Sequence, residues 1–317
     1  MAGIEILGTG NSKPRKVVTN DDLSKIVDTS DEWITTRTGI KKRNFCVEEK
    51  NMDLAYEAAS KAIESSGIST DDIGLLIVAT FTPDNASPSV SCMIQNKLGL
   101  GKDVMTFDIN AACSGFLYSL ETARAILNQI NEDKKNKKYA IVVGSEQIST
   151  RLNMEDRGSC VLFGDGAGAV VIGLSDNKRY YSIMGADGNS EALGCTGIQD
   201  GKPHVYMDGK QVFKTAVRTM TSVVKELLCK SQWDMGDIDY IVCHQANERI
   251  IDTVVRTLKA PAEKFYMNIA DYGNTSAASI PIAISEMNEK GILKKGMKVM
   301  FVGFGSGFTW GGILMEI

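Results

Sequence analysis

Cys113 and His244 are the two side chains of this sequence that could combine in nucleophilic chemistry. Cys113 lies in the segment NAACSG, residues 110–115, where a strand-like run ends and a helical pattern begins. Free amides and partial positive charge at a helix N-terminus favour a thiolate over a thiol, and small neighbours leave room for a substrate. A small, buried packing residue is the alternative interpretation, and the position alone does not separate the two.

The chain has only two histidines, so the choice of a partner for this thiol is narrow. His244 ends the apolar run YIVCH at residues 240–244. This predicts a place at the carboxyl end of a strand, where α/β folds bind ligands. A buried histidine that only satisfies local hydrogen bonds is the alternative. His204 belongs to the polar stretch 199–204 and is expected in a loop.

The elements that must position these residues occur twice in the same order. Helical patterns alternate with apolar, strand-like runs, which predicts an α/β fold. The first part has a helix at about 54–65 and strands at 73–79, 105–109, 139–144 and 166–172. The second part has a helix at about 212–229 and strands at 238–244, 265–269, 298–303 and 311–315. We therefore expect two similar halves, residues 1–174 and 175–317, the first carrying the cysteine and the second the histidine.

Such a repeat would bring Asn274 opposite Cys113. Both residues follow the second strand of their half and precede a helix, and a pseudo-twofold axis would bring the two junctions to one central site. A carboxamide N–H and an imidazole N–H directed at one point would stabilise an enolate oxygen. Loss of one such donor typically costs roughly 3–4 kcal/mol. Taken alone, Asn274 also fits an ordinary helix cap.

Composition excludes several classes of function. A net charge of -4 and a pI of about 5.4 give no general attraction for nucleic acid or for an anionic membrane. No apolar run approaches the roughly 18 residues of a membrane span, and the first residues lack the features of a signal peptide. Seven cysteines without a CxxC pair indicate a reducing compartment rather than disulfides or structural zinc. We expect a cytoplasmic protein without a metal or cofactor.

Two glycine-rich segments, FGDGAGA at 163–169 and GFGSGFTWG at 303–311, do not fit a dinucleotide-binding turn between a strand and a helix. Close approach of the backbone to a substrate is the better interpretation. The lysine-rich run at 134–138 is expected to be a solvated turn between a helix and a strand.

Several motifs together resemble the β-ketoacyl-acyl carrier protein synthase III family of the thiolase superfamily. They are DTSDEWI (28–34), TRTGI (36–40), AACSGF (111–116), FGDGAGA (163–169), HQAN (244–247) and GNTSAAS (273–279). The resemblance runs from about residue 4 to the C-terminus. It implies the thiolase fold, with a five-stranded mixed sheet in each half and αβαβα layering, and it implies a homodimer.

The resemblance also implies a reaction, the start of type II fatty acid synthesis. Cys113 would attack acetyl-CoA or another short acyl-CoA, which is a substrate and not a cofactor. Malonyl-acyl carrier protein would then lose CO2, with His244 and Asn274 stabilising the enolate that attacks the acyl-cysteine. Backbone amides of Cys113 and Ser306 would hold the tetrahedral oxyanion, and Phe304 would form an apolar wall beside the nucleophile.

Binding residues follow by matching position in the same family. Trp33 and Arg151 are expected to stack on the two faces of the CoA adenine, because an indole and a planar guanidinium both stack well. Arg37, with Thr29 nearby, is expected to contact the CoA phosphates. The pantetheine tunnel is expected to be lined by Met207, Gly209, Phe213 and Asn247. The acidic carrier protein is expected to bind to Lys214, Arg249 and Arg256. For each of these charges alone, a solvated surface residue is the alternative.

Two departures from the family pattern bear on specificity. Ser87 stands where some acetyl-preferring relatives have an aromatic residue, which is contributed across the dimer to the acyl pocket. We therefore expect the pocket to admit primers longer than acetyl, including branched ones. Cys243 stands before His244, where proline is common, and is interpreted as a change in packing.

Three other functions compete with this interpretation. A thiolase-fold starter synthase of secondary metabolism, making a quinolone or polyketide with a different acceptor, is the nearest. A degradative thiolase fits less well, because the GSG segment at 305–307 lacks the second reactive cysteine of that class. A non-catalytic scaffold homologue is disfavoured by the intact set of Cys113, His244 and Asn274.

Overall fold

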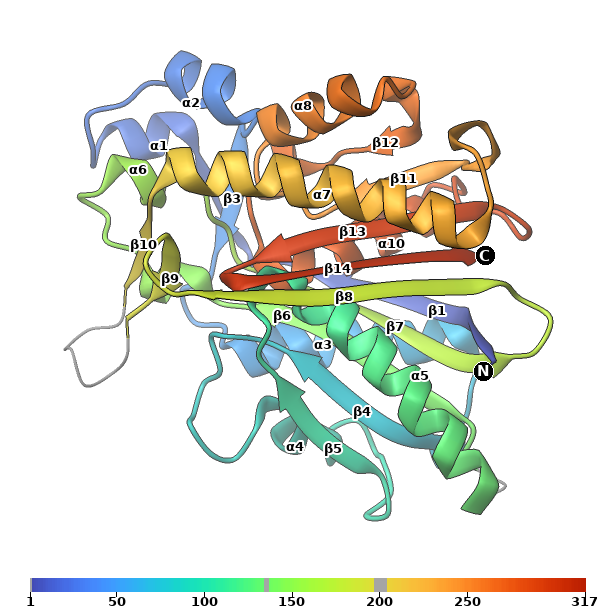
Figure 1. Cartoon of the computed structure of the whole chain (residues 1–317). Helices are drawn as coiled ribbons and strands as arrows, with labels where there is room; N and C mark the ends of the chain where they lie inside the picture. Colours follow the sequence, from blue (N-terminus) through green and yellow to red (C-terminus); the bar gives the residue numbers. More distant parts are fainter. Residues whose placement is uncertain (1, 134–136, 197–203) are drawn as a thin grey trace.

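The fold is built on two five-stranded mixed sheets of the same topology (Figure 1). The computed structural model describes residues 2–133, 137–196 and 204–317. The first sheet runs in the order β1 (Gly3–Ser12), β7 (Gly166–Ser175), β6 (Tyr139–Glu146), β4 (Ile73–Ala79), β5 (Met105–Ile109). The second runs in the order β8 (Tyr180–Asn189), β14 (Gly307–Glu316), β13 (Lys298–Gly305), β11 (Tyr240–Cys243), β12 (Phe265–Tyr266).

Strand directions also agree between the two sheets. In the first sheet, β7 pairs antiparallel with both β1 and β6. In the second sheet, β14 pairs antiparallel with both β8 and β13. The remaining pairings are parallel: β4 pairs with β6 and β5 in the first sheet, and β11 pairs with β13 and β12 in the second. The predicted α/β architecture with two similar mixed sheets is therefore confirmed. The division at residues 174 and 175 stays a prediction.

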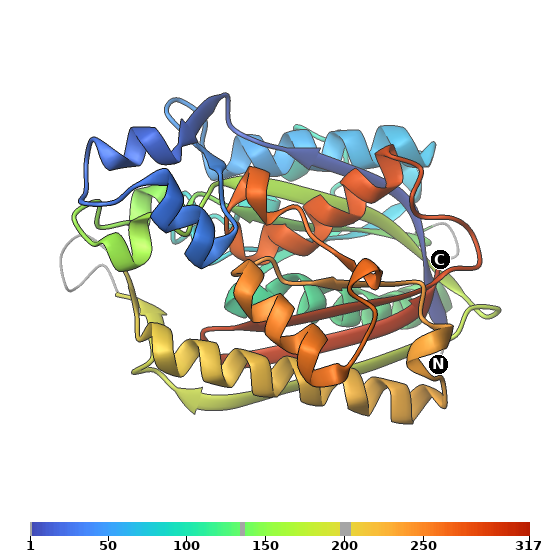
Figure 2. The ribbon, with the colours of Figure 1, turned by 90° about the horizontal axis from the view of Figure 1, so that it is seen from above.

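Helices separate and cover the two sheets, which gives five layers (Figures 1 and 2). Their bounds are α3 (Asn51–Ser66), α4 (Val90–Gln95), α5 (Gly115–Asp133), α7 (Gly209–Ser231), α8 (Glu248–Leu258) and α10 (Ser279–Glu289). One apolar cluster joins α5 and α10 to the inner faces of both sheets. A second packs α7 and α8 on the outer face of the second sheet, and a third packs α3 on the outer face of the first.

Strand β4 shows why the central strands are apolar throughout. Successive side chains of a strand point to opposite faces. Leu75 and Ile77 contribute to the inner cluster, whereas Leu76 and Val78 contribute to the outer cluster under α3. Both faces are covered, so the strand has no exposed position and reads as a continuous hydrophobic run.

The turns that precede α5 and α10 are equivalent in detail. Each helix follows a short 3-10 turn, η2 (Ala112–Ser114) or η7 (Ser276–Ala278), whose first residue has a left-handed backbone, with φ of 46° or 50°. The Oδ1 of Asn110 accepts from the Ala112 N–H at 3.2 Å, and the Oδ1 of Asn274 accepts from the Ser276 N–H at 2.9 Å.

The predicted pairing of the two junctions therefore needs a correction of register. Asn274 corresponds to Asn110, and the position that corresponds to Cys113 is Ala277. The strand-to-helix junctions are equivalent, as expected, but the cysteine and the asparagine occupy different positions within them. The sequence alone could not fix this register, because identity between the halves is low.

Smaller elements form a cap over the carboxyl ends of the central strands. They are β2 (Lys16–Thr19), β3 (Lys42–Phe45), α1 (Asn20–Ser24), α2 (Asp31–Thr38), η3 (Ile148–Arg151), α6 (Arg157–Cys160), β9 (Leu193–Cys195), β10 (Val205–Met207) and α9 (Ile269–Tyr272). Their apolar side chains form a fourth cluster. The expected turn at 134–138 and the loop at 199–204 fall largely outside the described residues. Within the described ranges, no helix is long and apolar enough to cross a membrane.

Candidate active site

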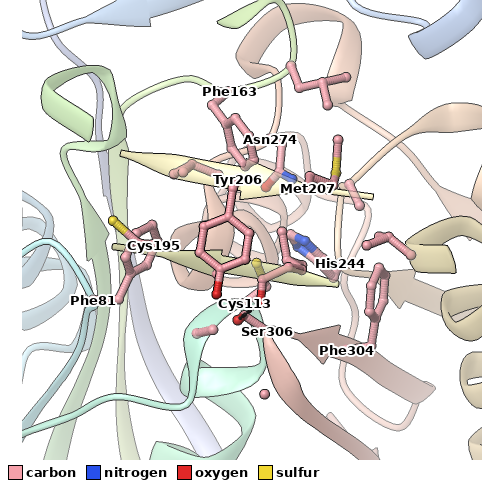
Figure 3. A pocket seen from close by; sticks show the side chains of 18 of the residues that line it. Phe81, Cys113, Phe163, Cys195, Tyr206, Met207, His244, Asn274, Phe304 and Ser306 are labelled. Carbon is pink, nitrogen blue, oxygen red and sulfur yellow. Dashed lines mark hydrogen bonds between the residues drawn. The ribbon is translucent and has the colours of Figure 1, made fainter. Parts of the chain in front are cut away.

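One cavity of about 450 Å³ contains the residues expected to carry chemistry. Its walls include Cys113, His244, Asn274, Phe304 and Ser306 (Figure 3). The first of these comes from the first half of the chain and the others from the second half. The structure thus brings together side chains that are far apart in the sequence.

Cys113 lies in the turn η2, directly before α5. A Cβ placed on Gly305 would lie 2.7 Å from the Cys113 amide nitrogen, so only glycine allows the end of β13 to approach this turn. Burial raises the pKa of the Cys113 thiol to about 12, and the Ser276 hydroxyl opposes that rise in part. The helix N-terminus was expected to favour the thiolate; burial of the thiol acts in the opposite direction.

His244 follows β11 and extends the pairing of that strand, because its N–H donates to the Val302 carbonyl at 2.7 Å. The side chain is 1% exposed. Its Nδ1 lies 2.7 Å from the Ser279 Oγ, at the start of α10. The ring meets Phe304 edge-on, with centroids 5.9 Å apart. Burial lowers the pKa of His244 to about 3, so the imidazole is neutral throughout the physiological range.

Asn274 is held on three sides by hydrogen bonds. Its N–H donates to the Leu162 carbonyl at 2.8 Å, and its carbonyl accepts from the Gly164 N–H at 3.0 Å. Its Oδ1 accepts from the Ser276 N–H at 2.9 Å, which assigns the other end of the amide as Nδ2. Since the oxygen is engaged with the backbone, the Nδ2 group is the end left for the cavity (Figure 3).

Phe304 and Ser306 come from the end of β13 and the turn into β14. Phe304 is 3% exposed and presents its ring to the cavity. Ser306 lies between the two strands, and its Oγ donates to the Leu193 carbonyl at 2.5 Å. This bond holds the Ser306 side chain against β9, and Figure 3 shows Ser306 beside Cys113.

The matches to known proteins agree with this geometry. The model of the family 3-oxoacyl-[acyl-carrier-protein] synthase III matches residues 107–191, and the model of its C-terminal part matches residues 228–317. The β-ketoacyl-[acyl-carrier-protein] synthase III of Clostridium acetobutylicum is 47% identical over 328 residues, which cover 100% of this chain and 99% of the relative. The chain belongs to the 3-oxoacyl-[acyl-carrier-protein] synthase III family. The sequence resemblance is thereby confirmed, and the chain is an acyltransferase.

Solved structures support the same family and fold. The 3-oxoacyl-[acyl-carrier-protein] synthase III of Aquifex aeolicus is 43% identical, with a TM-score of 0.93 over 99% of this chain and 100% of that one. A priming β-ketosynthase from the R1128 polyketide biosynthetic pathway is 32% identical, with a TM-score of 0.91 over 99% of this chain and 96% of the other. The thiolase fold is therefore confirmed.

Four of the residues expected to bind CoA in this synthase III chain line the same cavity. They are Met207, Gly209, Phe213 and Asn247. Asn247 also caps α8, because its Oδ1 accepts from the Arg249 N–H at 2.9 Å, and its Nδ2 donates to the Arg37 carbonyl at 3.1 Å. This side chain therefore ties the start of α8 to the end of α2, at the edge of the cavity.

The other expected CoA residues lie outside that cavity wall. Among the described residues, the guanidinium groups over the Trp33 ring are those of Arg37 and Arg157, each 4.7 Å from the ring centroid. Arg151, expected on the other face of the adenine, lies near Cys195, where burial raises the pKa of the thiol and the charge of Arg151 opposes that rise; its adenine-binding role stays a prediction. Arg157 was not among the residues expected at this site; it also donates to the Asp28 carbonyl at 2.8 Å. The Thr29 Oγ1 is buried and has no hydrogen-bond partner.

The three basic residues expected to meet a carrier protein are all exposed: Lys214, Arg249 and Arg256. Lys214 lies on α7, and the two arginines lie two turns apart on α8. Ser87 is exposed and does not line the cavity of its own chain, where Phe81 forms part of the wall.

The remaining motifs take their roles from packing. Cys243 is 1% exposed and belongs to the apolar cluster under α7 and α8. A Cβ on Gly164 would lie 2.2 Å from the Tyr272 carbonyl oxygen, and one on Gly305 would meet the backbone of the nucleophile turn. The glycine-rich segments were expected to approach a substrate closely, and both contribute residues to the cavity wall, among them Phe163 and Gly307. Gly164 and Gly305 in addition allow segments of the protein's own backbone to approach each other.

Proposed function

We propose that this chain starts fatty acid synthesis by condensing a short acyl-CoA with malonyl-acyl carrier protein through an acyl-Cys113 intermediate. The observation that carries the proposal is the content of one cavity: a nucleophilic thiol, a neutral imidazole and a carboxamide whose N–H end is unengaged. These groups supply a covalent carrier for one acyl unit and two hydrogen-bond donors for an enolate.

In the first half-reaction, the Cys113 sulfur attacks the thioester carbonyl of the acyl-CoA. The carbonyl oxygen becomes an oxyanion, which the backbone N–H groups of Cys113 and Ser306 hold. The intermediate collapses by breaking the bond to the CoA sulfur, and CoA leaves as a thiol with the proton that Cys113 gave up. The new thioester then remains on Cys113.

In the second half-reaction, the malonyl group loses CO2 and its thioester becomes an enolate. The Nε2–H of His244 and the Nδ2–H of Asn274 donate to the enolate oxygen, and the enolate carbon attacks the carbonyl carbon of the acyl-cysteine. The bond from that carbon to the Cys113 sulfur then breaks, the 3-oxoacyl-carrier protein leaves, and the Cys113 thiolate takes up a proton from solvent. The Ser279 Oγ lies 2.7 Å from Nδ1. With the hydroxyl as donor in this hydrogen bond, the imidazole proton is held on Nε2. Phe304 disfavours the malonyl carboxylate in the ground state, because an apolar wall cannot solvate a charge.

Acyl-CoA enters along Met207, Gly209, Phe213 and Asn247, and its adenine stacks on Trp33. We place Arg157 in the stacking role first given to Arg151, since Arg157 already lies on the indole. The exposed charges of Lys214, Arg249 and Arg256 receive the acidic carrier protein.

Three further features belong to the same proposal. The chain works as a homodimer in the cytoplasm, and it has no nucleic-acid or membrane partner. Ser87 reaches the acyl pocket of the partner subunit. The halves divide at residues 174 and 175, in the connection between β7 and β8.

The test has two stages. Mass spectrometry after mixing with acetyl-CoA is expected to detect an acyl adduct on Cys113, and addition of malonyl-carrier protein is expected to give the 3-oxoacyl product. Cys113→Ala should give neither. Full product formation by Cys113→Ala would overturn the mechanism, and bound CoA without an adduct on the unaltered chain would support a scaffold.

A starter synthase of polyketide synthesis is the second candidate, and the likeness to the priming β-ketosynthase favours it. The two functions differ in the acceptor. Turnover with a carrier protein from fatty acid synthesis supports the first function. Turnover only with a polyketide carrier protein or another malonyl acceptor supports the second.

A further inference from the structure

Phe81 contributes an aromatic ring to the wall of the cavity, but the proposed mechanism gives this ring no role. Figure 3 shows Phe81 and Phe304 on opposite sides of Cys113. Cys195 lies on the side of Phe81, and Met207 of the proposed tunnel lies on the other side. The cavity therefore continues past the nucleophile, away from the tunnel, and Phe81 forms part of the wall at that far end.

The wall around Phe81 is apolar. Its ring packs against the apolar cluster of the cap, to which Leu162, Phe163 and Cys195 also belong, and all four side chains line the cavity. Burial raises the pKa of the Cys195 thiol, so this side chain too is uncharged at neutral pH. Walls of this kind favour a hydrocarbon chain and disfavour a charged or hydroxylated group. An alkyl chain carried by the nucleophile fits this end of the cavity.

Glu146, at the end of β6, holds the segment that carries Phe81. The acid is 0% exposed. Its Oε2 accepts hydrogen bonds from the Thr82 hydroxyl at 2.6 Å, the Thr80 hydroxyl at 3.2 Å and the Phe81 N–H at 3.2 Å. One buried oxygen thus fixes three consecutive residues, and only the middle one of the three lines the cavity.

A second set of hydrogen bonds fixes the same segment from other elements. The Nδ2 of Asn51, at the start of α3, donates to the Thr80 Oγ1 at 2.9 Å and to the Thr82 carbonyl at 3.0 Å. The Thr80 N–H donates to the Ile109 carbonyl, at the end of β5, at 3.1 Å. Because these bonds are buried, the Phe81 backbone cannot move aside for a longer acyl chain without leaving polar groups unpaired.

The hydrogen bonds of Glu146 lead to Phe81 and not to the reacting groups. In the described part of the chain, none joins its carboxyl group to Cys113, His244 or Asn274. Burial raises the pKa of Glu146 to about 8, so the carboxyl group carries a proton at neutral pH. Glutamine has nearly the shape of a protonated glutamic acid and keeps one oxygen for the three donors, whereas alanine keeps none. These two replacements therefore separate the hydrogen bonds from the acidity.

We propose that Phe81 limits the length of the acyl group that Cys113 accepts and that Glu146 is the positioning residue that holds Phe81 in place, an inference that rests on the proposed function. The ring closes the apolar end of the cavity beyond the thioester. The chain therefore takes short acyl-CoA primers and excludes medium-chain ones. Phe81 sets the length of a pocket whose width the small Ser87 is proposed to leave open.

The test compares two primer lengths in the acylation of Cys113. Rapid-quench mass spectrometry measures the acylation rates with butyryl-CoA and with octanoyl-CoA in the unaltered chain and in Phe81→Ala. One methylene too many in an apolar pocket costs roughly tenfold to two-hundredfold. We expect Phe81→Ala to raise the ratio of the octanoyl rate to the butyryl rate at least tenfold. A rise below threefold, or an unaltered chain that takes octanoyl as fast as butyryl, would overturn the proposal.

Phe45→Ala is the matched control. Phe45 is 9% exposed and belongs to the same apolar cluster of the cap, but it is not part of the cavity wall. Both rates are measured on one preparation, so their ratio does not depend on the fraction of folded protein. The ratio in Phe45→Ala should stay within threefold of the unaltered one. Equal rises in Phe45→Ala and Phe81→Ala would overturn the proposal, since they indicate a general loosening of the cap.

Replacements of Glu146 test its positioning role by the same ratio. Glu146→Ala should raise the ratio as Phe81→Ala does, and Glu146→Gln should keep it within threefold of the unaltered one. The double variant should not exceed Phe81→Ala alone, because two residues that act through one group are not additive. Should Glu146→Ala fail to fold, Thr82→Val removes the shortest of the three bonds and should give the same rise.

Three results would overturn the positioning role. They are an unchanged ratio in Glu146→Ala and in Thr82→Val, a ratio in Glu146→Gln as high as that in Phe81→Ala, and an additive rise in the double variant. Failure of the unaltered chain to be acylated by any short acyl-CoA would instead refute the proposed function.

Discussion

Replacement of Asn274 by Asp and by Ala tests the donor that Asn274 is proposed to supply. Aspartate keeps an oxygen that can accept from the Ser276 N–H, now at 2.9 Å from Oδ1, but it replaces the Nδ2 donor with a second oxygen. Loss of one donor to the enolate typically costs about 3–4 kcal/mol, or roughly a hundredfold to a thousandfold in rate. A carboxylate facing the enolate adds repulsion, about 4 kcal/mol for two charges 4 Å apart near a protein surface.

Asn274→Ala should therefore lose roughly a hundredfold to a thousandfold in condensation, and Asn274→Asp should lose more. Both variants should be acylated by acetyl-CoA at the unaltered rate, because the first half-reaction uses the backbone amides near Cys113. The assay is single-turnover condensation of pre-acylated enzyme, with CO2 release measured in parallel. Condensation within threefold of the unaltered rate in both variants, or an equal loss in acylation, would refute the reasoning.

Four further outcomes are expected. Ser279→Ala should slow condensation by up to about tenfold, the worth of one hydrogen bond, and leave acylation unchanged in single-turnover assays. Because the folded pKa of His244 lies below its ordinary value, the fold loses stability as pH falls from about 6.5, by at most about 1.4 kcal/mol per pH unit. Urea unfolding should show a smaller loss in His244→Gln. Arg157→Ala should raise the KM for acyl-CoA by about threefold to thirtyfold, with a smaller effect in Arg151→Ala; the reverse order would restore the original assignment. Turnover of butyryl- and isobutyryl-CoA should match or exceed that of acetyl-CoA, because Ser87 is small; strict acetyl preference would contradict this.

The strands and the repeated order of parts were readable from the sequence because central strands buried on both faces are apolar at every position. His244 was readable for a similar reason: it ends such a run, and the chain has only one other histidine. These features depend on local pattern, which a sequence displays directly.

Other features depend on which segments meet in space. Ser279 ends the motif at 273–279, but nothing in the sequence shows that it reaches His244, since a serine at the start of a helix is usually interpreted as a cap or a packing residue. Arg151 and Arg157 lie in the same short segment, and only the fold determines which of them reaches Trp33. The pKa of Cys113 depends on burial, which the local argument from the helix N-terminus left out.

The matched turns before α5 and α10 allow the two halves of this fold to take different chemical roles. Both turns use the same backbone, with an asparagine whose oxygen accepts from the amide two residues later. One turn then presents a thiol at the position where the other has Ala277. Since the backbone is set by the asparagine and the left-handed residue, the side chain at the next position can change without rebuilding the turn. A duplicated scaffold of this kind can specialise one copy for covalent chemistry and the other for electrostatics, and keep the frame of both.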